Sequence, residues 1–144
     1  MAILTAMKNL LMNIVAVLVG LLLGGIANMS LVMIGPQVIA PPPGVDMSDV
    51  KSLSASIHLL QPKHFLFPFL AHALGTFVGA GVTHFIARTH RASLGFLIGA
   101  LSLAGGIAAC FMIPAPVWFM ALDLVVAYLP MAWLGIKLGD CLRR

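Results

Sequence analysis

Four apolar stretches dominate this sequence, and each is long enough to cross a lipid bilayer. They cover about residues 10–35, 65–87, 93–113 and 117–138, and a transmembrane helix needs about 20 mostly apolar residues. Of the 144 residues, 61% are hydrophobic and 8% are charged, whereas about a quarter of a soluble domain is charged. The sequence therefore predicts an all-α, polytopic membrane protein, with four transmembrane helices in one compact bundle and residues 1–144 forming a single domain. We expect the first stretch to be a retained span, because its apolar run is longer than the core of a signal peptide.

The basic residues predict how these spans are oriented. With four spans, both chain ends share one side of the membrane with the loop between the second and third spans. Basic residues gather on that side: Lys8, Arg88, Arg91, Lys137, Arg143 and Arg144. The other side holds only Lys51 and Lys63, so the positive-inside rule places both termini in the cytoplasm of a bacterial-type inner membrane. The positive charge favours anionic lipid headgroups rather than nucleic acid, because there is no soluble basic domain to hold a duplex.

The long loop after the first span contains a short stretch with helical periodicity. Apolar residues recur at helical spacing over about residues 47–60, with polar residues on the other side. Asp46 is expected to cap this helix, and Pro62 is expected to stop it. We predict an amphipathic helix that lies on the outer membrane surface or on the mouth of the bundle, either as a strap or as a lid.

Small residues predict how the spans touch one another. In lipid, glycines let helix backbones approach closely. The glycines expected to pack against other helices are Gly20, Gly24, Gly75, Gly79, Gly105 and Gly106. These contacts can form within one chain, in a homo-oligomer or with another membrane protein.

Three spans carry a polar residue at the same depth. Asn28, His72 and Asp123 lie seven residues from Gly35, Phe65 and Pro116 at the outer ends of their spans, which is about 10 Å at 1.5 Å per residue. Polar groups at this depth are costly unless they face the bundle interior and pair, so Asp123 is expected to accept a hydrogen bond from His72. Thr76 lies one turn deeper on the face of His72, and Tyr128 lies deeper along the fourth span. This layer is either a polar clamp between helices or a site that binds a proton or a small ligand.

Other site chemistry has little support in the sequence. Cys110 and Cys141 fall near opposite membrane surfaces, and His72 and His84 share one helix, about 18 Å apart, instead of facing each other across a haem. The histidines and aspartates of the outer loop match no metal-ligand spacing, and no nucleophile motif or phosphate-binding loop occurs. We therefore expect no cofactor and no metal.

The sequence favours two classes of function over an enzymatic one. The first is a non-enzymatic membrane protein that acts by packing, as an accessory or self-assembling subunit, and the glycines favour it. The second is a small transporter or channel-like protein that binds a proton or a polar solute at Asn28, His72 and Asp123. From the sequence alone, the packing class ranks first.

The predicted orientation can be tested by cysteine labelling in intact cells. An impermeant thiol reagent added outside should label a Ser54→Cys variant and leave a Thr89→Cys variant unlabelled, because only the first loop is expected outside. The opposite labelling pattern would place the amphipathic helix in the cytoplasm.

Overall fold

The computed structural model describes residues 1–143 and contains helices but no strand in that part of the chain. Its elements in order are α1 (Ala2–Val38), α2 (Val50–Ser56), the 3-10 turns η1 (Ile57–Leu59) and η2 (Pro62–Phe65), α3 (Leu66–Ile86), α4 (Arg91–Met112), α5 (Val117–Val126) and α6 (Leu129–Leu142). Four segments are long and apolar enough to cross a membrane, with α5 and α6 together forming the fourth. The predicted all-α bundle of four membrane-spanning segments is therefore confirmed.

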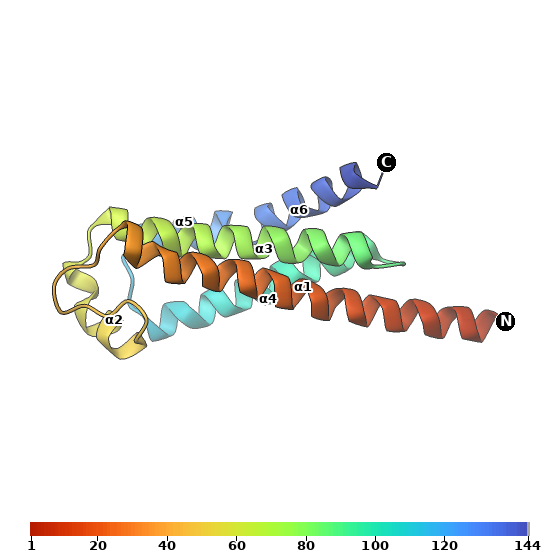
Figure 1. The fold of residues 1–144 in the computed structure, drawn as a ribbon, viewed down its shortest axis with the longest axis horizontal. Helices are drawn as coiled ribbons and strands as arrows, with labels where there is room; N and C mark the ends of the chain where they lie inside the picture. The colour runs from red at the N-terminus through yellow and green to blue at the C-terminus, as the bar shows by residue number, and fades with distance from the viewer. Residues whose placement is uncertain (144) are drawn as a thin grey trace.

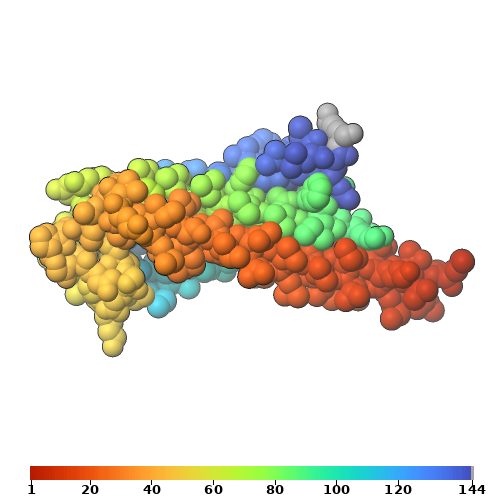
Figure 2. Space-filling view, in the orientation of Figure 1, coloured from red at the N-terminus to blue at the C-terminus, as the bar shows by residue number. Residues whose placement is uncertain are grey.

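Helix α3 lies at the centre of the bundle. It packs along α1 on one side and against α4 and α6 on others, whereas α1 and α4 touch over a short length only. Both chain ends lie at the end of the bundle opposite α2, and the first turns of α1 extend beyond the other helices (Figure 1). In the space-filling view, a hollow is visible where the yellow outer loop meets α1 and α4 (Figure 2).

Glycines make the contact between α1 and α3 close. A Cβ atom added at Gly24 would lie 2.6 Å from the carbonyl oxygen of Gly75, and one added at Gly79 would lie 3.0 Å from the carbonyl oxygen of Gly20. The hydroxyl of Thr83 adds a hydrogen bond across the same interface, donating to a carbonyl of α1 at 3.2 Å. Gly20, Gly24, Gly75 and Gly79 therefore pack against one another inside one chain.

The two neighbouring glycines of α4 have different surroundings. Gly106 is buried against the ring of Tyr128, but a Cβ at Gly105 would meet no atom within 4 Å. Consecutive helical residues point about 100° apart, because a turn takes 3.6 residues, so both cannot face one neighbour. Within this chain Gly105 therefore packs against no other helix, and contacts with a second chain stay a prediction.

The fourth span is interrupted and longer than predicted. Helix α5 ends at Val126, α6 begins at Leu129, and Pro130 stands in the first turn of α6. Proline has no N–H group to continue the hydrogen-bond ladder of α5 and disfavours helical backbone in the residue before it. Helix α6 then continues to Leu142, so the expected single helix over 117–138 is corrected to two helices that end later.

The outer loop forms a shorter helix than predicted, with a different cap. Asp49, not Asp46, precedes α2, and its carboxylate accepts a hydrogen bond from the Ser52 N–H at 2.9 Å. Asp46 instead accepts from the N–H and hydroxyl of Ser48, and these bonds hold the pKa of Asp46 below its ordinary value. His64, near the end of the outer loop, is buried, and its Nδ1 accepts a hydrogen bond from the Gln61 N–H at 2.9 Å.

Neighbouring glycines of α1 allow a matched test of the α1–α3 contact. Gly24→Leu should lower the free energy of unfolding by about 1–3 kcal/mol, the usual cost of overpacking, because its Cβ would meet the backbone of α3. Gly25→Leu should leave stability almost unchanged, since a Cβ there meets nothing within 4 Å. Thermal unfolding of the two purified variants measures the difference, and equal stabilities would contradict the close contact.

Candidate functional site

Three polar side chains meet inside the outer half of the bundle. Nδ1 of His72 on α3 lies 3.0 and 2.9 Å from Oδ1 and Oδ2 of Asp123 on α5. The hydroxyl of Tyr128 donates to Oδ2 of Asp123 at 2.8 Å and lies 3.1 Å from Nδ1 of His72. We call His72, Asp123 and Tyr128 the polar cluster.

The interruption of the fourth span brings Tyr128 into this cluster. In a continuous helix, residues five apart point about 140° away from each other, so the side chains at 123 and 128 would face different neighbours. Tyr128 has φ −115° and ψ −84°, outside the helical region, and this turns its ring toward α3. The ring then stacks on the imidazole of His72, with centroids 5.8 Å apart.

Burial is unequal within the polar cluster. Asp123 is 4% exposed and Tyr128 is 2% exposed, whereas the side chain of His72 is 28% exposed. A buried carboxylate loses its hydration, at an effective cost of several kcal/mol unless neighbours replace it. Here two donors replace water, and the least buried member is the one that can exchange protons.

The hydrogen bonds determine how the imidazole is arranged. If the carboxylate of Asp123 is ionised it only accepts hydrogen bonds, and Nδ1 of His72 then donates the proton between the two groups. In the neutral ring, Nε2 then carries the lone pair. No group of the described chain is hydrogen-bonded to this Nε2, which leaves it available to a ligand or a proton.

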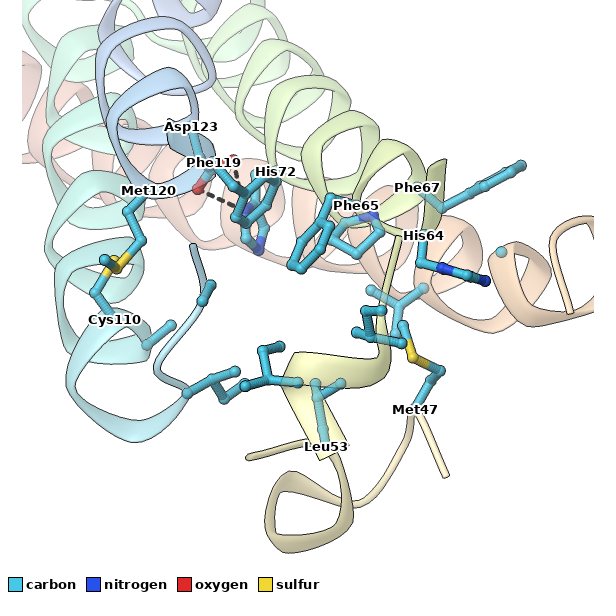
Figure 3. A pocket seen from close by; sticks show the side chains of 18 of the residues that line it. Met47, Leu53, His64, Phe65, Phe67, His72, Cys110, Phe119, Met120 and Asp123 are labelled. Atoms are coloured by element: carbon cyan, nitrogen blue, oxygen red, sulfur yellow. Dashed lines mark hydrogen bonds and ion pairs between the residues drawn. The ribbon is translucent and has the colours of Figure 1, made fainter. Parts of the chain in front are cut away.

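An outer cavity of about 230 Å³ lies beneath the outer loop. Figure 3 shows His72 and Asp123 joined at one wall, with Phe119 beside them. Met47 and Leu53 of the loop lie on the opposite side. The walls are otherwise mostly apolar, so His72 and Asp123 supply the main polar groups in this part of the cavity.

An inner cavity of about 300 Å³ lies between α1, α3 and α4. Its polar lining comes from Asn28, His72, Thr76, Ser102 and Tyr128. His72 lines both cavities, whereas Asp123 lines only the outer one, so the imidazole borders two spaces of different character.

The predicted site residues thus divide into two groups. His72 and Asp123 are hydrogen-bonded, and Tyr128, expected only to lie deeper, is bonded to both. Asn28 makes no hydrogen bond to His72 or Asp123 in the structure and lines the inner cavity, as does Thr76. Asn28 is kept on that side by close packing, because its Cβ lies against Gly75 of α3.

A second histidine–aspartate pair, which the sequence analysis missed, lies near the other end of α3. Nε2 of His84 is 2.8 Å from Oδ1 of Asp140, and Nε of Arg91 donates to the backbone oxygen of His84 at 3.0 Å. Asp140 lies two residues beyond the predicted end of the fourth span at residue 138. The same depth matching that pairs His72 with Asp123 finds this pair once α6 is known to extend past it.

Metal-binding groups are sparse in the described residues. Histidine, cysteine and aspartate side chains form no group of three or more that could hold a metal ion there. Cys110 lines the outer cavity and Cys141 is exposed, and both are free thiols. The imidazole, carboxylate and phenol of the polar cluster can form hydrogen bonds and exchange protons.

Comparison with protein-family models, with curated proteins and with solved structures finds no match for this chain. The fold by itself defines a class, that of all-α membrane proteins with four spanning segments.

A double-mutant cycle tests the energetic link between His72 and Asp123. Asp123→Asn and His72→Leu should each destabilise the protein, because each leaves its partner without its hydrogen bond in a low-dielectric site. The loss of unfolding free energy in the double variant should be smaller than the sum of the losses in the two single variants, with a coupling energy of about 0.5–3 kcal/mol. Additive losses in thermal or denaturant unfolding would show that the pair contributes no interaction energy.

Proposed function

We propose that this protein is a small transporter or channel-like protein in which the polar cluster binds a proton and the polar group of a solute. The observation that carries the proposal is the position of His72. Its Nδ1 is held by Asp123, no group within residues 1–143 is hydrogen-bonded to its Nε2, and its ring lines both cavities.

The proposed chemistry follows from the charges of the pair. Nε2 of a neutral His72 accepts either a proton or a hydrogen bond from a solute. When it takes a proton, the imidazolium lies against the carboxylate of Asp123, so the site gains no unbalanced charge inside the membrane. Ionisable groups within membrane spans commonly mark such proton or solute pathways.

The sidedness of the proposal rests on the distribution of basic residues. Both termini and the α3–α4 loop are proposed to be cytoplasmic, in a bacterial-type inner membrane. The outer cavity then faces the extracytoplasmic side, beneath α2. In this arrangement a proton reaches His72 from outside through the outer cavity.

The alternative class, a packing or self-assembling subunit, has less support than the sequence suggested. Its main argument was the set of glycines, and those of α1 and α3 contact each other within the chain. The exposed apolar residues of the first turns of α1, among them Ile3 and Met7, are still available to lipid, to a homo-oligomer or to another membrane protein.

Proton movement through the polar cluster can be measured in proteoliposomes that contain a trapped pH-sensitive dye. An imposed potential, negative inside, should drive proton uptake in the wild type, and both Asp123→Asn and His72→Gln should reduce uptake to the level of protein-free liposomes. His58→Gln, a change in the exposed outer loop, is the matched control and should behave as the wild type. Uptake that is equal in all variants would overturn the proposal.

A further inference from the structure

The inner cavity has an opening in the wall formed by α1 and α4. Gly25 on α1 and Gly105 on α4 both line this cavity, and both are exposed. A Cβ atom at either position would meet no atom within 4 Å. Because α1 is packed along α3 and touches α4 over a short length only, the two helices leave a gap where these glycines lie.

This opening faces the hydrocarbon of the bilayer. Gly105 lies seven residues from the end of α4 at Met112, which is about 10 Å along the helix, and the hydrocarbon core is about 30 Å thick. Leu21, Ile26 and Leu101 near the opening are 42%, 53% and 47% exposed. A molecule that enters here comes from the lipid phase and passes an apolar rim.

Inside the opening, the cavity offers neutral hydrogen-bonding groups. Asn28 contributes an amide, and Thr76, Ser102 and Tyr128 contribute hydroxyls. Of the described residues that line it, His72 is the sole ionisable group besides the Tyr128 phenol, and no aspartate, lysine or arginine takes part. Such a lining suits an uncharged polar group, because a buried ion without a charged partner is costly.

We propose that the inner cavity takes a single-chain, uncharged amphiphile of the long-chain alcohol type from the bilayer. Its hydroxyl lies among Asn28, Thr76 and Ser102, and its alkyl chain leaves through the opening between Gly25 and Gly105. The inference goes beyond the proposed function, because the cavity and its opening do not depend on proton movement through the polar cluster.

Photolabelling in nanodiscs tests this inference. The probe is hexadecanol with a photoreactive diazirine near its hydroxyl, in nanodiscs of phosphatidylcholine, and the labelled residues are mapped by mass spectrometry. Labels should appear on the segments of α1, α3 and α4 that line the inner cavity. Unlabelled hexadecanol should compete, and hexadecane, which lacks the hydroxyl, should not. Equal competition by hexadecane would mean that the opening merely holds a hydrocarbon chain, and it would overturn the proposal.

Two neighbouring residues of α4 provide a matched pair of variants. Gly105→Leu should close the opening without a clash in the fold, and it should lower labelling of the inner cavity by about tenfold, equivalent to about 1.4 kcal/mol. Ala104→Leu adds the same side chain at an exposed position that does not line the cavity, so labelling should stay at the wild-type level. Thermal unfolding checks that both variants are folded. Labelling that persists in Gly105→Leu, or that falls equally in both folded variants, would contradict the opening.

The proton-uptake assay separates this inference from the proposed function. Competed labelling together with unchanged proton uptake in Asp123→Asn would leave the amphiphile site standing and overturn the proton pathway. Loss of uptake in Asp123→Asn, with no labelling of the inner cavity in the wild type, would overturn the amphiphile site alone.

Discussion

The carboxylate of Asp123 must be stabilised away from water, and much of the outer half of the bundle is arranged to do so. It is 4% exposed, and it accepts hydrogen bonds from His72 on α3 and from Tyr128 at the interruption of its own span. The first bond joins two helices, and the second requires the helix to break. The contact of α5 with α3 at this level and the polar wall of the outer cavity therefore follow from one buried carboxylate and its donors.

The second constraint is the close approach of α1 to α3. Glycines at the crossing bring the two backbones together, so that a side chain at Gly24 would meet the carbonyl of Gly75. Helix α1 cannot pack as closely against α4 at the same time, and the space between those helices becomes the inner cavity. Tight packing on one side of α1 and an opening on its other side are thus two results of the same geometry.

Helix α3 is fastened to the fourth span at two levels by the same chemistry. His72 pairs with Asp123 and His84 pairs with Asp140. The histidines are separated by about 18 Å along α3, whereas the aspartates would be about 25 Å apart along one continuous helix. The interruption between α5 and α6 and the different path of the fourth span accommodate this difference. In the His84–Asp140 pair, the side chain of Asp140 is 50% exposed. This pair therefore joins the ends of α3 and α6 and is not a buried site.

The sequence by itself determined the class of the protein, the four spans and the depth at which His72 and Asp123 lie, because hydrophobic length and the rise of a helix depend on local composition alone. It did not determine which faces of the helices meet. Asn28 shares the depth of His72 yet lines a separate cavity, Gly105 faces an opening while its neighbour Gly106 packs, and Tyr128 joins the cluster because the helix breaks before Pro130. Rotation about a helix axis and the site of a break are set by contacts between helices, so only the tertiary structure decided where the cavities and the free nitrogen of His72 lie.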